Sequence, residues 1–161
     1  MSRIRRKMEP TLNENKKKLI CELRKDARKK LTDISGELKI PVSTLFDMLN
    51  DLENRKILKH KSIVRFEDIG YPFQIFLALK TEKNKRDSLK EFLKSQKNVN
   101  GIFQIGPDYD FFIDTIFRNY KEFQSFCENL ETNNTLTEKN YFHVIDVIQK
   151  EKFLENIGHF E

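Results

Sequence analysis

The 161-residue sequence predicts an α+β protein in which three short helices precede a β-α-β-β-α-β succession. Apolar residues recur at helical spacing three times before residue 55, and β-prone runs alternate with two further helical patterns after residue 72. Charge divides the chain at the same place. The first 70 residues hold 18 Lys and Arg against 11 Asp and Glu, the remainder holds 12 against 14, and 12 of the 14 Phe follow residue 70. A basic part joined to a near-neutral part suggests polyanion binding in the first and sensing or assembly in the second.

Composition excludes several classes of protein. No apolar run approaches the roughly eighteen residues that a membrane span needs. The basic N-terminus is followed by polar residues, so we expect no secretion signal and a soluble, cytoplasmic protein without a membrane partner. Cys21 and Cys127 have no metal-ligand spacing, and we expect two reduced, buried thiols and no metal site.

The first two helices follow from apolar faces and a cap. Residues 13–25 form the first, with one apolar face made by Leu19, Ile20, Leu23 and Ala27. Thr32 is expected to cap the second helix, which turns Ile34 and Leu38 to the core. Pro41 ends it, because a proline disfavours helical geometry in the preceding residue.

The third helix is expected over residues 44–54, capped by Ser43 or Thr44. It carries an apolar stripe of Leu45, Met48, Leu49 and Leu52. The opposite face then shows Ser43, Thr44, Asp47, Asn50, Asp51 and Asn54. The β-prone runs 57–60 and 62–66 suit a hairpin that Lys59, His60, Lys61 and Arg65 make basic. Three helices and such a hairpin predict a winged helix-turn-helix, which usually delivers one helix into the DNA major groove.

The second part follows a hinge at residues 67–72. Strands are expected at 73–80, 99–105, 110–117 and 141–148, with helices at 87–96 and 120–130. This order is the ferredoxin-like pattern, in which helices cover one face of the sheet. We therefore divide the chain into a basic N-terminal arm (1–11), a winged helix-turn-helix domain (12–66), the hinge, a ferredoxin-like domain (73–154) and a C-terminal tail (155–161).

An ordered series of short motifs resembles the Lrp/AsnC (feast/famine) family of prokaryotic transcription regulators over roughly residues 12–154. The series comprises 18–23 (KLICEL), 26–28 (DAR), 34–35 (IS), 41–45 (PVSTL), 52–58 (LENRKIL), 69–71 (IGY) and 108–110 (DYD). The resemblance implies a DNA-binding domain followed by a domain, called RAM, for ligand sensing and oligomerisation. Family members dimerise through the sheets of their RAM domains, and many bind an amino acid or similar metabolite. Expected partners are therefore double-stranded DNA and a homodimer or higher homo-oligomer, with no cofactor beyond such an effector.

The residues expected at DNA fall into two groups. Ser43, Thr44, Asp47 and Asn50 lie on the outward face of the third helix, whereas Lys59, His60, Lys61 and Arg65, with Arg5 and Arg6 of the arm, would grip phosphates. Asp47 and Asp51 oppose phosphate binding, although Asp can accept a hydrogen bond from cytosine N4. The alternative is a ligand-sensing or adaptor oligomer whose acidic third helix binds a protein, with DNA binding weak or lost.

A ligand site is expected at the turn before the third strand of the second domain, at Gly106, Asp108, Tyr109 and Asp110. A carboxylate there would hold the ammonium of a small ligand at a dimer interface. The alternative is a β-turn whose Asp residues bond to the local backbone. An enzyme is not expected, because the three His are scattered and no nucleophile-base pair or glycine-rich phosphate loop stands out.

Overall fold

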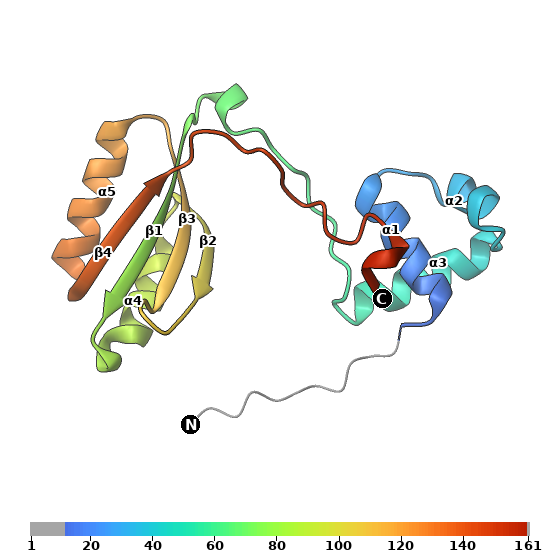
Figure 1. The fold of residues 1–161 in the computed structure, drawn as a ribbon, viewed down its shortest axis with the longest axis horizontal. Helices are drawn as coiled ribbons and strands as arrows, with labels where there is room; N and C mark the ends of the chain where they lie inside the picture. Colours follow the sequence, from blue (N-terminus) through green and yellow to red (C-terminus); the bar gives the residue numbers. More distant parts are fainter. Residues whose placement is uncertain (1–11, 161) are drawn as a thin grey trace. The chain divides into compact units, whose positions relative to one another are not determined.

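The computed structural model describes residues 12–160, and these fall into two compact units (Figure 1). One unit is Ile63–Ile148, and the other joins the residues up to Ser62 to those from Gln149 onward. The basic arm predicted over residues 1–11, with Arg5 and Arg6, lies outside the described residues.

The first unit contains the three predicted helices, α1 (Glu14–Lys25), α2 (Leu31–Leu38) and α3 (Val42–Asn54). Their apolar stripes meet in one core around Leu19, Leu23, Ile34, Leu45 and Leu52. The Asn13 side chain caps α1 by accepting a hydrogen bond from the Lys16 N–H at 2.9 Å. The three helices and most of their buried faces were therefore correctly predicted, but Ala27, assigned to the apolar face of the first helix, lies beyond the end of α1 and is exposed.

The predicted caps of α2 and α3 are wrong. Helix α2 begins one residue before Thr32, so this threonine lies inside the first turn, and no side chain caps the helix. Helix α3 begins at Val42, directly after Pro41, and its first turn already includes Ser43 and Thr44. A proline serves well at a helix start, because its missing N–H would have no partner there in any case.

The segment after Gln149 completes the first unit, whereas the sequence assigned it partly to the second domain and partly to a separate tail. Leu154 and Phe160 pack against the three-helix core, and the short 3-10 helix η3 (Ile157–Phe160) contacts α1. The Arg24 guanidinium of α1 donates to the Phe153 carbonyl at 3.0 Å and pairs with the Glu151 carboxylate at 3.0 Å.

Residues 57–65, expected as most of a β-hairpin wing, form no strand, and this prediction is wrong. β-Prone side chains stabilise a strand only where they pack against cross-strand neighbours or a buried face. Ile63 and Val64 are instead exposed to solvent. The segment leads into the 3-10 helix η1 (Glu67–Ile69), which ends at Gly70 with a positive φ of 88°.

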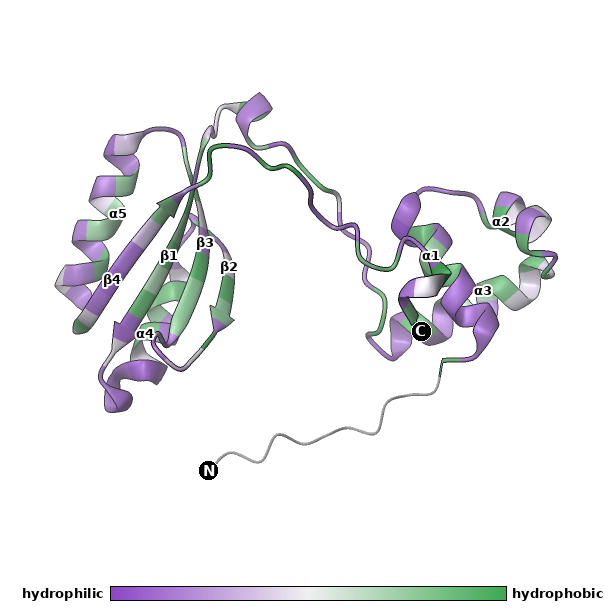
Figure 2. Ribbon diagram, viewed as in Figure 1, coloured by the Kyte–Doolittle hydropathy of each residue, from purple (hydrophilic) through white to green (hydrophobic). Residues whose placement is uncertain are grey.

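The second unit has the predicted ferredoxin-like order. Its elements are β1 (Phe73–Thr81), α4 (Arg86–Ser95), β2 (Val99–Gln104), β3 (Phe111–Phe117), α5 (Tyr120–Asn133) and β4 (Leu136–His143). The antiparallel sheet has the order β2-β3-β1-β4, and α4 and α5 lie on the same face of it (Figure 1). Hydrophobic residues gather along the central strands β1 and β3, whereas β4 is mostly hydrophilic (Figure 2).

The core of this unit lies between the sheet and the two helices. Its buried residues include Leu77 and Ile113 of the strands, Leu93 of α4 and Phe126 of α5. Phe117 ends β3 inside this cluster, and its ring centroid lies 5.5 Å from that of Phe126. The α+β fold class predicted from the sequence is confirmed.

The last strand was misplaced. It covers Leu136–His143 and not residues 141–148. Pairing with β1 sets this limit, because His143 already lies opposite Ile75, near the start of β1. The Val144 N–H still donates to the Gln74 carbonyl of β1 at 2.9 Å, but the apolar residues that follow form no strand, and Ile145 is 95% exposed.

Both cysteines carry free thiols, Cys21 buried and Cys127 partly buried. Burial raises the pKa of each thiol above its ordinary value. Within residues 12–160, no helix has the length and apolar character needed to cross a membrane, and no cluster of His, Cys, Asp and Glu could hold a metal ion.

Candidate nucleic-acid interface

The outward face of α3 is defined by its exposed side chains. Ser43 and Asp47 are exposed, as predicted, but Thr44 and Asn50 are half-buried. The exposed positions of the helix are Val42, Ser43, Phe46, Asp47, Glu53 and Asn54. No Lys or Arg occurs within Val42–Asn54, so this face offers carboxylate, amide, hydroxyl and apolar groups only.

Two members of this face, Val42 and Phe46, were missed at the sequence level. Successive residues of a helix are about 100° apart, so Phe46 turns away from the stripe that Leu45 and Leu49 share. The signal was therefore present in the spacing. An apolar residue is usually taken for a core residue, and this concealed it.

Asp51 does not present a free charge on this face. Its carboxylate accepts a hydrogen bond from the Lys16 ammonium of α1 at 2.6 Å and from the Arg55 guanidinium at 3.3 Å. The Lys16 bond, with a smaller contribution from Arg55, holds the pKa of Asp51 below its ordinary value. Of the two aspartates that oppose DNA binding, one is therefore compensated within the fold.

The predicted wing residues differ in how they are used. The His60 imidazole lies 3.0 Å from the Glu53 carboxylate. Arg65, which belongs to the second unit, pairs with Glu67 at 2.8 Å and with Asp68 at 3.3 Å, and these carboxylates raise its pKa.

Lys59 and Lys61 are both exposed. Within the described part of the chain, no carboxylate lies within 4.0 Å of either ammonium. Of the basic residues predicted to form the wing, Lys59 and Lys61 are therefore the two whose charge is available to a polyanion.

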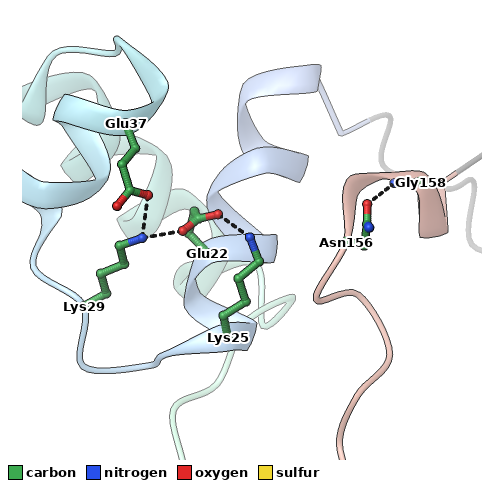
Figure 3. Close-up of polar contacts among 6 residues, drawn as sticks. All are labelled: Glu22, Lys25, Lys29, Glu37, Asn156 and Gly158. Carbon is green, nitrogen blue, oxygen red and sulfur yellow. Dashed lines mark hydrogen bonds and ion pairs between the residues drawn. The ribbon is translucent and has the colours of Figure 1, made fainter.

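An ion-pair network fixes the connection between α1 and α2 (Figure 3). The Lys29 ammonium lies 2.5 Å from both the Glu22 and the Glu37 carboxylates, and Lys25 lies 2.7 Å from Glu22. Hydrogen bonds from Lys25 and Lys29 lower the pKa of Glu22 to about 2, and the two carboxylates raise the pKa of Lys29 to about 12. Lys29 is thus committed to holding the helices and is not a free cation.

The returning C-terminal segment lies beside α1 in the same unit, near Glu22 and Lys25. There the Asn156 side chain accepts a hydrogen bond from the Gly158 N–H at 3.1 Å, at the start of η3 (Figure 3). The described residues of this first unit hold 15 Lys and Arg against 10 Asp and Glu, so the unit remains basic after its internal pairs are formed.

The predicted ligand turn is largely occupied by internal contacts. The buried Asp110 carboxylate accepts the Thr81 N–H at 2.9 Å and pairs with the Arg86 guanidinium at 2.5 Å. The Tyr109 hydroxyl donates to the Glu138 carboxylate of β4 at 2.6 Å, and this bond raises the pKa of Tyr109.

Gly106 and Asp108 of the same turn are exposed. A Cβ added at Gly106 would meet no atom within 4 Å, so local packing does not require a glycine there. Asp110 therefore ties the turn to the end of β1 and the start of α4, and Asp108 is the carboxylate of this turn that remains exposed.

The face of the sheet that α4 and α5 leave open is aromatic. The rings of Phe76 and Phe112 stack with their centroids 5.2 Å apart, and the neighbouring Phe103 and Phe142 are exposed. Polar groups also lie on this face. The Asp114 carboxylate accepts hydrogen bonds from Gln74 at 2.7 Å and Asn100 at 2.5 Å.

No family model matches the chain. Among curated proteins, an uncharacterised HTH-type transcriptional regulator of Pyrococcus abyssi is 23% identical over 145 residues, which cover 89% of this chain and 99% of that protein. The similarity therefore extends over both units.

Solved structures share the fold. A transcriptional regulator of Neisseria meningitidis, in complex with L-Met, superposes with a TM-score of 0.80 at 17% identity and covers 87% of this chain and 94% of that chain. AsnC of E. coli superposes with a TM-score of 0.77 at 18% identity, over 86% and 96% of the two chains.

Proposed function

We propose that this chain, which is of the Lrp/AsnC type, is a sequence-specific DNA-binding transcription regulator that acts in the cytoplasm and is not an enzyme. The observation that carries the proposal is the outward face of α3, which stands on a three-helix core in the more basic of the two units. The HTH-type regulator from P. abyssi, similar over 89% of the chain, supports the same conclusion.

Different residues would bind the DNA phosphates and recognise the bases. Lys59 and Lys61 would neutralise phosphates, because their ammonium groups are exposed. Asp47 would accept a hydrogen bond from cytosine N4, and Ser43 would contact a phosphate or a base. Thr44 and Asn50, which are half-buried, would contribute through their accessible polar atoms only. His60 and Arg65 would reach phosphate by exchanging their present carboxylate partners.

The open aromatic face of the sheet supports a homodimer. Phe76 and Phe112 would be covered by the same face of a second copy, since a large apolar patch on a soluble protein marks an interaction site. Sedimentation of the Phe103→Glu variant tests this. We expect it to shift the protein to monomer, while Ile145→Glu, an exposed residue of the same unit, leaves the oligomer intact.

An amino acid or similar metabolite would modulate assembly, in line with the L-Met complex of the N. meningitidis regulator. The turn at Gly106–Asp110 remains our candidate site, with the exposed Asp108 as the group for the ligand's ammonium. Thermal shift across the amino acids measures this. Loss of a shift in Asp108→Asn would support the site, and no shift with any amino acid would count against it.

Band-shift titration of duplex DNA over a salt series tests DNA binding itself. Replacing Lys59 and Lys61 by Ala should weaken binding to all sequences alike and lower the salt slope by about 2. The matched control removes two exposed lysines of the second unit, Lys83 and Lys85, and should leave affinity unchanged. Weak affinity that is flat with salt would contradict the proposal.

An adaptor that binds a protein through α3 is the second candidate, because Asp47 gives this face a negative charge that DNA does not favour. Asp47→Asn discriminates between the two. It should change DNA affinity if α3 lies in the groove and leave it unchanged if α3 serves an adaptor.

A further inference from the structure

Val42 and Phe46 form an exposed apolar ledge on α3. They lie one helical turn apart, and their residues are 40% and 54% exposed. Neither belongs to the buried core of the first unit, which Leu45 and Leu52 of the same helix enter. The fold therefore places an aromatic ring in solvent on the face that bears Asp47.

The net positive charge of the unit that bears the ledge favours nucleic acid as its occupant, although Asp47 on the same helix opposes it. Lys16 and Arg55 compensate Asp51, and the Glu53 carboxylate lies 3.0 Å from the His60 imidazole, so within the described chain Asp47 is the acidic residue of α3 that no Lys, Arg or His side chain approaches within 4.0 Å. The unit as a whole is basic. Two side chains are also too small an area for a stable protein interface, which buries about 1,200–2,000 Å².

The major groove offers one apolar group to such a ledge, the C5-methyl of thymine, and phenylalanine is among the side chains that contact it. Cytosine presents its N4 amino group in the same groove, and the Asp47 carboxylate can accept a hydrogen bond from that group. Helix α3 has no Lys or Arg for the O6 and N7 of guanine. The residues of this face thus match the groups that pyrimidines expose.

We propose that Val42 and Phe46 read thymine methyl groups, so that the bound sequence carries a required thymine opposite Phe46 next to a position where Asp47 favours cytosine. This inference rests on the proposed DNA-binding function and specifies which bases the helix selects. Specificity then comes from methyl contact, whereas Lys59 and Lys61 supply affinity that does not depend on sequence.

Uracil substitution isolates the methyl group, because deoxyuridine pairs as thymidine does but lacks the C5-methyl. Duplexes are first selected from a random pool with the full chain, and each thymine of the selected site is then replaced in turn. We expect one replacement to weaken wild-type binding about fourfold, the effect of burying one carbon group. Replacements elsewhere in the site should have little effect.

Variants assign the effect to the ledge. Phe46→Ala should bind the thymine and uracil duplexes equally, and Phe46→Leu should restore part of the difference because it keeps an apolar side chain. Ile145→Ala, a matched exposed residue of the second unit, should retain the full wild-type difference. Circular dichroism confirms that each variant is folded, which the exposure of both residues favours.

Equal uracil sensitivity in wild type and Phe46→Ala, or a selected site without a fixed thymine, would overturn the ledge proposal. Salt-dependent binding in the same experiment would then leave the DNA-binding function intact. Absence of duplex binding at every salt concentration would instead overturn the proposed function, and the reading of bases with it.

Discussion

Replacing Glu22 by Gln removes the carboxylate that joins Lys25 and Lys29, and we expect the first unit to lose about 2–3 kcal/mol of stability at pH 7. The magnitude follows from the pKa of Glu22, which these partners lower from its ordinary 4.5 to about 2. A change of one pKa unit corresponds to about 1.4 kcal/mol, so the contacts in the folded state favour the charged form of Glu22 by about 3 kcal/mol. The Glu22 side chain is 11% exposed, so solvent screens little of this.

Glu37→Gln is the matched control, because its carboxylate pairs with the same Lys29 at the same distance but is 53% exposed. An exposed ion pair contributes at most about 1 kcal/mol. Amide hydrogen exchange of α1 at pH 7 measures the loss in the full chain, since it reports on this unit alone. Equal losses in the two variants would refute the argument that burial strengthens the Glu22 contact.

The pH dependence provides a second check of the same contact. Because folding lowers the pKa of Glu22, its contribution is fully present above about pH 4.5 and is lost as the pH falls towards 2. The difference in unfolding free energy between wild type and Glu22→Gln, measured with the uncharged denaturant urea, should therefore shrink between about pH 5 and pH 2 by about the whole effect. A difference that stays constant over this window would contradict the ion-pair explanation.

Three further outcomes are expected. Arg24→Ala should free the C-terminal segment, cost about 1–2 kcal/mol and speed amide exchange at Leu154 about tenfold. Asp110→Ala should cost about 2–4 kcal/mol in thermal unfolding, because it leaves a buried backbone N–H and Arg86 without their acceptor, whereas an asparagine there should cost less. Leu93→Ala should cost about 2–5 kcal/mol in denaturant unfolding, because the residue is fully buried.

The resemblance to the Lrp/AsnC regulators is confirmed at the level of fold. The fold could be predicted because the spacing of apolar residues in the sequence indicates the helices and strands. Stripes such as Leu45 to Leu52 indicate buried helix faces locally, and the apolar, β-prone runs around Leu77 and Ile113 indicate strands. Boundaries were less predictable. The end of β4 at His143 depends on where β1 begins, and residues 145–148, although β-prone, form no strand.

The candidate interface could be predicted in outline only. Exposure of Ser43 and Asp47 follows from helical geometry, but the state of Asp51 depends on Lys16, which lies 35 residues earlier in the chain. No local sequence pattern predicts an ion pair between residues so far apart in the chain. The absence of the predicted wing strands has a similar cause. Whether the β-prone residues around Ile63 form a strand depends on the residues they pack against, and the local sequence does not identify those residues.

The return of residues 149–160 to the first unit has a consequence for biosynthesis. Phe160 packs against helices that end by Asn54, so the ribosome must add about another hundred residues before that core can be completed. At about 5–20 residues per second, the delay is about 5–20 s. Within this time the second unit, a continuous segment, is synthesised in full. The helical unit is therefore completed only after every residue of the second unit has been added to the chain.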